Sequence, residues 1–381
     1  MTRVLKGSLK TISIIILFVV AIFSAKANQL QPSVDVVFTV DMSGSTNGII
    51  DDLRDKIWDI HNQLHYMRPT PNIRIGVVGY ARPSFGVFNN QVKVIVPLTK
   101  DVDLMSDELF KIKANIEKGD QFVGAALRAS IELINWSTSP NAVKIIYLIG
   151  NGTVNLGAFD FREAYEMAQK NNITINTMYC YSSLRVRDYS GWAEIANGTG
   201  GEVADIKVHK RLPVFTTVDD LDKLRLLAKQ LSSTYVYYGK SGYNRYKMMV
   251  NIDRFALESS QQTFESMLYY KISDSYQGKQ SDWDLIDYLK AGRGNLSEID
   301  SELLNDSLKK FNAEQLRNRL MQLKDKRTRI INQLRELLPF ERQTQVNKFY
   351  DDTAEDNGMV LDRVFMTSLL KTFKAKGIVV E

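Results

Sequence analysis

The chain has 381 residues, of which 44% are hydrophobic and 24% are charged, so it can form two domains or one large domain with an extension. Four of its five net positive charges are those of Arg3, Lys6, Lys10 and Lys26 in the first 27 residues, which contain no acid, so the remainder carries only +1. A nearly neutral chain lacks the strong basic excess of a nucleic-acid-binding protein, and we expect no nucleic-acid partner.

The first 27 residues have the pattern of an export signal. Arg3, Lys6 and Lys10 precede an apolar stretch over 12–23, and Ala25-Lys26-Ala27 then offers small residues at the cleavage positions. The stretch is shorter than the roughly 20 residues that a spanning helix needs. We therefore expect a signal peptide over 1–27, no stable membrane span after its removal, and a mature protein in the periplasm or outside the cell. A retained anchor is the alternative.

Residues 28–240 alternate between two hydrophobic patterns. Short apolar runs predict strands, and apolar residues at spacings of three and four predict helices. The predicted strands are 34–40, 73–80, 92–98, 143–149 and 173–181, and the predicted helices are 49–67, 104–116, 123–134, 161–170, 192–196 and 219–231. Such alternation is typical of an α/β fold with a doubly wound, mostly parallel sheet. Cys180, the only cysteine, lies in the last of these strands, where we interpret it as a buried core residue.

The pattern changes after Gly239, and residues 241–381 predict an α-helical C-terminal region. Helices are expected over 255–272, 282–290 and about 313–338. The last has a heptad-like apolar series, with Arg327 in one apolar position, and nine bases against two acids between Lys309 and Arg335. We expect its apolar stripe to pack on its own domain or to pair with another helix as a coiled coil; its basic face could also bind an anionic surface.

A short polar motif follows the first predicted strand. Asp41-Met42-Ser43-Gly44-Ser45 places one carboxylate and two hydroxyls on a tight loop at the carboxyl end of that strand. Parallel sheets bind ligands at this edge, and hard oxygen ligands suit Mg²⁺ or Mn²⁺. The motif therefore predicts a divalent metal site.

With this Asp-x-Ser-x-Ser motif, residues 33–240 resemble the von Willebrand factor type A family, whose metal-ion-dependent adhesion site uses two further loops. The resemblance places the second loop at 119–124, where no Thr is present and Asp120 is the expected ligand, with Gln121 as the alternate. It places the third at Gly150-Asn151-Gly152, where Asn151 replaces the family's Asp. Asp41 and Asp120 would then restore the usual two carboxylates, with Asn151 binding a metal-bound water.

Two further segments resemble those of bacterial exported members of this family, which carry a helical C-terminal extension. They are Lys56-Ile57-Trp58 and Trp283-Asp284-Leu285. The resemblance implies a non-enzymatic binding protein in which Asp41, Ser43, Ser45 and Asp120 hold Mg²⁺ or Mn²⁺. A carboxylate of a protein partner would complete the coordination. Neither the partner's identity nor the oligomeric state is indicated by the sequence.

Three alternatives remain open. The chain could be a scaffold with a vestigial metal site that acts through its helical tail. It could also be a metal-dependent hydrolase, although no general base is evident. His61 and His65, four residues apart on one predicted helix, have a spacing that can bind zinc. No third ligand accompanies them, and because they flank the apolar stripe, surface or boundary positions are the simpler interpretation.

Overall fold

The computed structural model describes residues 32–46, 48–112, 117–180, 189–208, 217–292, 296, 299–338 and 360–379; the side chains of Ser45, Val218 and Ser301 lie outside this description. The expected signal peptide also falls outside it. Within these ranges, no helix combines the length and the apolar character needed to cross a membrane.

Six strands form one sheet in the order β3-β2-β1-β4-β5-β6, in which all neighbouring pairs are parallel except β2 with β3. The strands are β1 (Ser33–Asp41), β2 (Asn72–Tyr80), β3 (Lys93–Thr99), β4 (Val143–Gly150), β5 (Ile173–Cys180) and β6 (Val203–Ile206). The doubly wound, mostly parallel α/β fold expected from the sequence is confirmed. Five of the strands match predicted apolar runs; β6 was not predicted.

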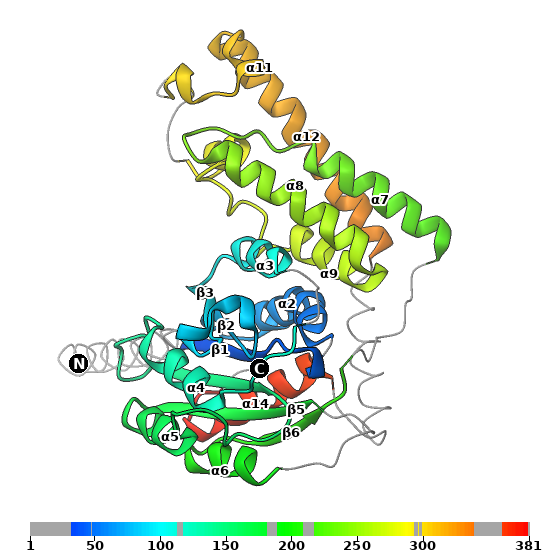
Figure 1. Ribbon diagram of the computed structural model, residues 1–381. Coiled ribbons are helices and arrows are strands. Elements are labelled where there is room, and N and C mark those ends of the chain that lie inside the picture. Colours follow the sequence, from blue (N-terminus) through cyan, green and yellow to red (C-terminus); the bar gives the residue numbers. More distant parts are fainter. Residues whose placement is uncertain are drawn as a thin grey trace, which may run out of the picture.

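Helices cover both faces of the sheet and continue above it (Figure 1). They are α2 (Ile49–Tyr66), α3 (Val102–Lys111), α4 (Val123–Glu132), α5 (Phe161–Lys170), α6 (Ser190–Gly198), α7 (Val218–Ser232), α8 (Gly242–Ser259), α9 (Gln261–Ile272), α10 (Leu285–Lys290), α11 (Asp306–Lys309), α12 (Ala313–Leu337) and α14 (Leu361–Ala375), with short 3₁₀ turns η1 (Gly44–Thr46), η2 (Pro83–Phe85), η3 (Val87–Asn89) and η5 (Ser301–Leu303).

The sheet is buried on both faces because its central strands are apolar on both sides. Alternate residues of β1 and β4 enter two separate cores: Phe38 and Tyr147 face the core beneath α2, whereas Val37 and Ile146 face the core beneath α4, α5 and α6. This arrangement leaves the ends of the strands as the accessible part of the sheet, and β1 and β4 end side by side at Asp41 and Gly150.

The last helix returns to the sheet. Phe365 of α14 is fully buried against Phe38 and Tyr147, with ring centroids 5.5 and 5.1 Å apart. The hydroxyls of Tyr147 and Ser368 are 2.9 Å apart. Residues 361–375, which the sequence analysis included in the C-terminal region without predicting a helix, therefore complete the core of the sheet domain.

Helices α7 to α12 form a helix block beside α2 and α3 (Figure 1). Helix α7, placed by the sequence analysis before its boundary at residue 240, packs against α12 and α8 in this block. The helix predicted over 255–272 is two helices, because Ser260 ends α8 and caps α9. Helix α9 packs on α2, where the Ser266 hydroxyl donates to Asp59 at 2.6 Å, and the Phe110 and Phe255 rings of α3 and α8 stack at 5.1 Å.

Arg327 occupies its apolar position on α12 as part of a buried ion pair. Its guanidinium donates two hydrogen bonds to Asp284, at 2.7 and 3.2 Å, and two to Thr234, at 3.1 and 2.9 Å. Its charge also lies 4.0 Å from the ring centroid of Tyr235. The expected burial of the α12 stripe within the chain is confirmed, since Leu316, Leu320, Ile330 and Leu334 are buried against this block; coiled-coil pairing stays a prediction.

Candidate metal site at the carboxyl edge of the sheet

The first loop of the site folds back on the end of β1. Asp41 is fully buried, and its Oδ1 accepts a 2.8 Å hydrogen bond from the amide of Ser43. The Thr46 hydroxyl donates to the carbonyl oxygens of Asp41 and Ser43, at 2.7 and 3.1 Å. Burial raises the pKa of Asp41 to about 6, although hydrogen bonds from Ser43, Gln121 and Thr46 act in the opposite direction. The side chain of Ser45, an expected ligand, lies outside the described residues.

Gln121, on the second loop, bridges the first and third loops. Its amide nitrogen Nε2 lies 3.0 Å from Asp41 Oδ2 and 3.0 Å from Asn151 Oδ1, and it donates to both. Two acceptor oxygens on different loops therefore converge on one point. The close approach requires glycine at residue 152, where the backbone has a φ of +77° and a β-carbon would lie 2.5 Å from Gln121 Oε1.

Asp120 lies in a different hydrogen-bond network. Its Oδ2 accepts from Gln91 Nε2 at 3.2 Å, and its backbone amide donates to Gln91 Oε1 at 3.0 Å. The structure thus brings Asp41, Gln121 and Asn151 together and directs the carboxylate of Asp120 to Gln91. This geometry favours the alternate ligand, Gln121, over Asp120. The two-carboxylate site expected from the sequence is not formed by the described side chains in this arrangement.

Aromatic side chains hold the third loop. Asn151 is almost fully buried. The indole nitrogen of Trp192 donates to the carbonyl oxygen of Gly152 at 2.8 Å, and the Tyr179 hydroxyl accepts from the Gly152 amide at 3.4 Å. The ring centroids of Tyr179 and Trp192 are 5.6 Å apart in an edge-to-face arrangement. These supports were not predicted; the only sequence signal was the pair of glycines that flanks Asn151.

A second set of contacts fixes the first loop against the second. The Gly44 amide donates to the Glu117 carbonyl oxygen at 2.8 Å. The Glu117 carboxylate in turn pairs with Arg82 at 2.7 Å and accepts from the Ser84 hydroxyl at 2.8 Å. The first loop is therefore tied to residue 117 by a backbone bond, and Arg82 and Ser84 hold the Glu117 carboxylate.

The donor set suits a hard divalent cation but carries little charge. Asp41 offers a carboxylate, Ser43 a hydroxyl and Asn151 an amide oxygen, and rotation of the Gln121 amide would add a fourth oxygen. Among the described residues there is no cluster of three or more His, Cys, Asp or Glu side chains. Oxygen ligands of this kind fit Mg²⁺ or Mn²⁺, and one carboxylate predicts weak binding.

The histidine pair lies apart from these loops. On α2, His61 packs edge-to-face on Tyr270 and His65 packs on Tyr66. Burial lowers the pKa of His61 to about 4, so its ring is neutral. The described chain has no group of three or more His, Cys, Asp or Glu side chains that could hold a metal, and His61 lies at the contact between α2 and α9.

Sequence comparison identifies the class of this domain. The model of the von Willebrand factor type A domain family matches residues 35–206, the segment from β1 to the end of β6. Residues 35–206 are therefore a von Willebrand factor type A domain. The comparison with curated proteins found no match.

Solved structures with this fold match about half of the chain. An aerotolerance-related membrane protein from Bacteroides fragilis is 17% identical, with 47% of this chain and 92% of that chain covered and a TM-score of 0.34. A von Willebrand factor type A protein from Catenulispora acidiphila is 18% identical, over 46% and 39% of the two chains, with a TM-score of 0.35. Proximal thread matrix protein 1 from the mussel byssus, solved with zinc in its metal-ion-dependent adhesion site, is 16% identical over 47% and 43%, with a TM-score of 0.37.

Proposed function

We propose that this chain is an exported, non-enzymatic binding protein that captures a carboxylate of a protein partner through a divalent cation at the Asp41 loop. This proposal rests on the convergence of two oxygens from different loops. Asp41 Oδ2 and Asn151 Oδ1 each lie 3.0 Å from the same atom, Gln121 Nε2. Both oxygens sit on loops at the edge where parallel sheets bind ligands. A domain of this family provides the scaffold.

Four described side chains would hold the cation, which we take to be Mg²⁺ or Mn²⁺. Asp41 would supply the negative charge, while Ser43, Asn151 and the rotated amide of Gln121 would supply neutral oxygens. A bound divalent ion supplies positive charge that attracts an acidic group. Because only one charge of the ion would be neutralised by Asp41, the remaining charge would favour a partner carboxylate strongly.

The surroundings of the site support binding rather than catalysis. The described groups that hydrogen-bond Asp41 include the amide and hydroxyl of Ser43, the Thr46 hydroxyl and the Gln121 amide, and none of these is a general base at neutral pH. The N-terminal pattern of Arg3, Lys6, Lys10 and Ala25-Lys26-Ala27 supports export.

One observation favours a second candidate, a scaffold without a working metal site. The Gln121 amide already satisfies both converging oxygens, so the site needs no cation to be stable. In that case the helix block would carry the interactions.

Partner capture distinguishes the two candidates. The mature chain is immobilised and exposed to cell-envelope extract in millimolar Mg²⁺ or in EDTA, beside the variants Asp41→Asn and Asp120→Asn. Metal-dependent capture predicts that EDTA and Asp41→Asn both release the same partner, whereas Asp120→Asn retains it. A partner that is retained under all four conditions would support the scaffold and exclude the metal-dependent function.

A further inference from the structure

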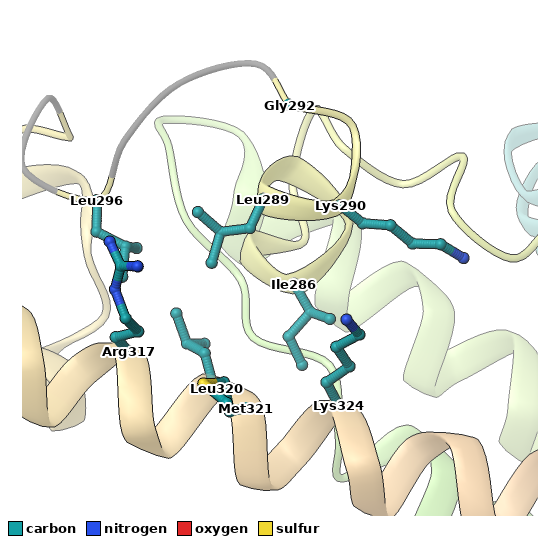
Figure 2. Close-up of a pocket in the computed structure, with 9 residues that line it drawn as sticks. All are labelled: Ile286, Leu289, Lys290, Gly292, Leu296, Arg317, Leu320, Met321 and Lys324. Atoms are coloured by element: carbon teal, nitrogen blue, oxygen red, sulfur yellow. The ribbon is translucent and has the colours of Figure 1, made fainter.

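A cavity of about 540 Å³ lies between α10 and α12, remote in sequence from the Asp41 loop (Figure 2). Ile286 of α10 points toward α12, Leu289 extends from α10 into the space above Leu320, and Leu320 rises from α12. Met321, also on α12, contributes a side chain that is 57% exposed. Among the described residues, the part of the lining between the two helices is therefore mainly apolar.

The charged side chains among the described residues that line the cavity are all basic. Arg317 and Lys324 rise from α12 on either side of Leu320, whereas Lys290 stands at the rim and extends away (Figure 2). Among the described residues that line the cavity none is acidic, and none of the three cations forms an ion pair within the described part of the chain. Two cations seven residues apart on one helix, with an apolar floor between them, match a ligand that has an apolar body and an anionic end.

The size of the cavity favours a small molecule over a protein segment. One turn of an α-helix, about 10–12 Å wide and 5.4 Å long, occupies roughly 400–600 Å³, so the cavity has room for about one turn. Peptide recognition by a helix in a groove uses anchors over two turns or more. The volume is instead within the range of small-ligand sites, roughly 300–1,000 Å³.

We propose that the cavity between α10 and α12 binds a single-chain aliphatic carboxylate, of the class of free fatty acids. The chain would lie on Leu289, Leu296 and Leu320, and its carboxylate would pair with Arg317 or Lys324. This inference does not depend on the Asp41 site, because the cavity shares no residue with it. In this proposal, basic residues of α12 bind the carboxylate of the ligand.

The test is a calorimetric titration of the full mature chain with dodecanoate, kept below its micelle concentration. Burial of about half the chain's methylenes corresponds to a Kd on the order of 1 mM. Pairing of the carboxylate with a cation is expected to tighten binding about tenfold, so the expected result is one site with a Kd of roughly 0.1 mM. Dodecyltrimethylammonium, with an equal chain and opposite charge, is expected to bind at least about tenfold more weakly. The double variant Arg317→Gln/Lys324→Gln is expected to weaken dodecanoate by about tenfold.

The matched control is Arg319→Gln/Lys326→Gln, which removes the same charge from exposed positions of α12 that do not line the cavity. It is expected to bind dodecanoate like the parent. Leu289→Trp, which fills the cavity from a partly exposed position, is expected to abolish binding without unfolding the chain. Equal binding of the two surfactants, equal loss in both double variants, or no binding by the folded parent would each overturn the proposal. So would binding only to phosphatidylglycerol vesicles, which would assign the basic face to a membrane surface.

Discussion

Replacing Gln121 by Glu tests the geometry of the site with an isosteric change. In the parent, Gln121 Nε2 donates to Asp41 Oδ2 and Asn151 Oδ1 at 3.0 Å each. In Gln121→Glu an oxygen takes the place of that nitrogen, so both hydrogen bonds are lost, at a cost of roughly 2–4 kcal/mol together. Two carboxylate charges about 3 Å apart also repel by up to about 5 kcal/mol at an effective dielectric constant near 20, although a shared proton relieves part of this.

A divalent cation reverses the effect, because the variant then has two carboxylates at one point. Gln121→Glu is expected to lower Tm in EDTA by at least about 5 °C. Mn²⁺ at 100 times its Kd is expected to restore about 2.7 kcal/mol. The assay is thermal unfolding followed by circular dichroism, with and without Mn²⁺.

The control for this change is Asp120→Asn, which is isosteric and lies in the same loop. Because the carboxylate of Asp120 pairs with Gln91, this variant is expected to keep the parent's Tm within about 2 °C and the parent's response to Mn²⁺. An unchanged Tm for Gln121→Glu in EDTA would refute the placement of Gln121 between the two loops. A metal response lost in Asp120→Asn would return Asp120 to the ligand set.

Three further changes test how the chain is held together. Arg327→Met should reduce the free energy of unfolding by about 3–5 kcal/mol in urea titration, because it leaves Asp284 buried without its partner. Adding Asp284→Asn should recover part of this loss. If the losses of the two single variants simply added in the double variant, the pairing would be contradicted. Phe365→Ala should cost about 3–5 kcal/mol by opening a cavity beneath the sheet, whereas a loss below 1 kcal/mol would contradict the docking of α14. Burial lowers the folded-state pKa of His61 to about 4, so the unfolded chain takes up a proton at higher pH than the folded one. The free energy of unfolding should therefore fall between pH 6.5 and 4, by at most about 3 kcal/mol. His61→Phe should flatten that part of the pH profile, and an unchanged slope would contradict the shift.

The fold was predictable where each element is a local pattern. Burial on both faces makes β1 and β4 continuous apolar runs, and burial on one face gives α2 its apolar spacing. Both patterns are visible along the sequence. The strand β6 is only four residues long and half-buried, too short to show a period. The helix α14 lies about 150 residues after β6, and nothing in the sequence between them indicates that residues 361–375 return to the sheet.

The site was predictable in its loops but not in its side-chain partners. Asp41 was chosen for its position after a buried strand and Asn151 through the family resemblance, and the structure brings both side chains to Gln121. The choice between Asp120 and Gln121 depended on charge alone, because neighbouring residues point in opposite directions and the sequence does not show which one faces Asp41. Gln91, which holds Asp120, is 29 residues away along the chain and carries no motif.

Arg327 shows the same limit in the helix block. Arg327 was noticed because a charged residue stands in an otherwise apolar series. Trp283-Asp284-Leu285 was noted only through a family resemblance. The structure joins the two, because Asp284 accepts from the guanidinium while Trp283 stacks on Tyr235 at 5.6 Å. Pairs of charges separated by 43 residues are set by tertiary packing, which periodicity does not encode.

The most direct test of the proposed function is calorimetric titration of Mg²⁺ and Mn²⁺ into the parent chain and into Asp41→Asn. Asp41 is the only carboxylate among the described side chains that converge on the site. We expect one ion per chain with a millimolar or tighter Kd for the parent, and binding at least about tenfold weaker, or about 1.4 kcal/mol, for the variant. A parent that binds neither ion at millimolar concentration, or a variant that binds as the parent does, would contradict a metal-dependent function at this loop.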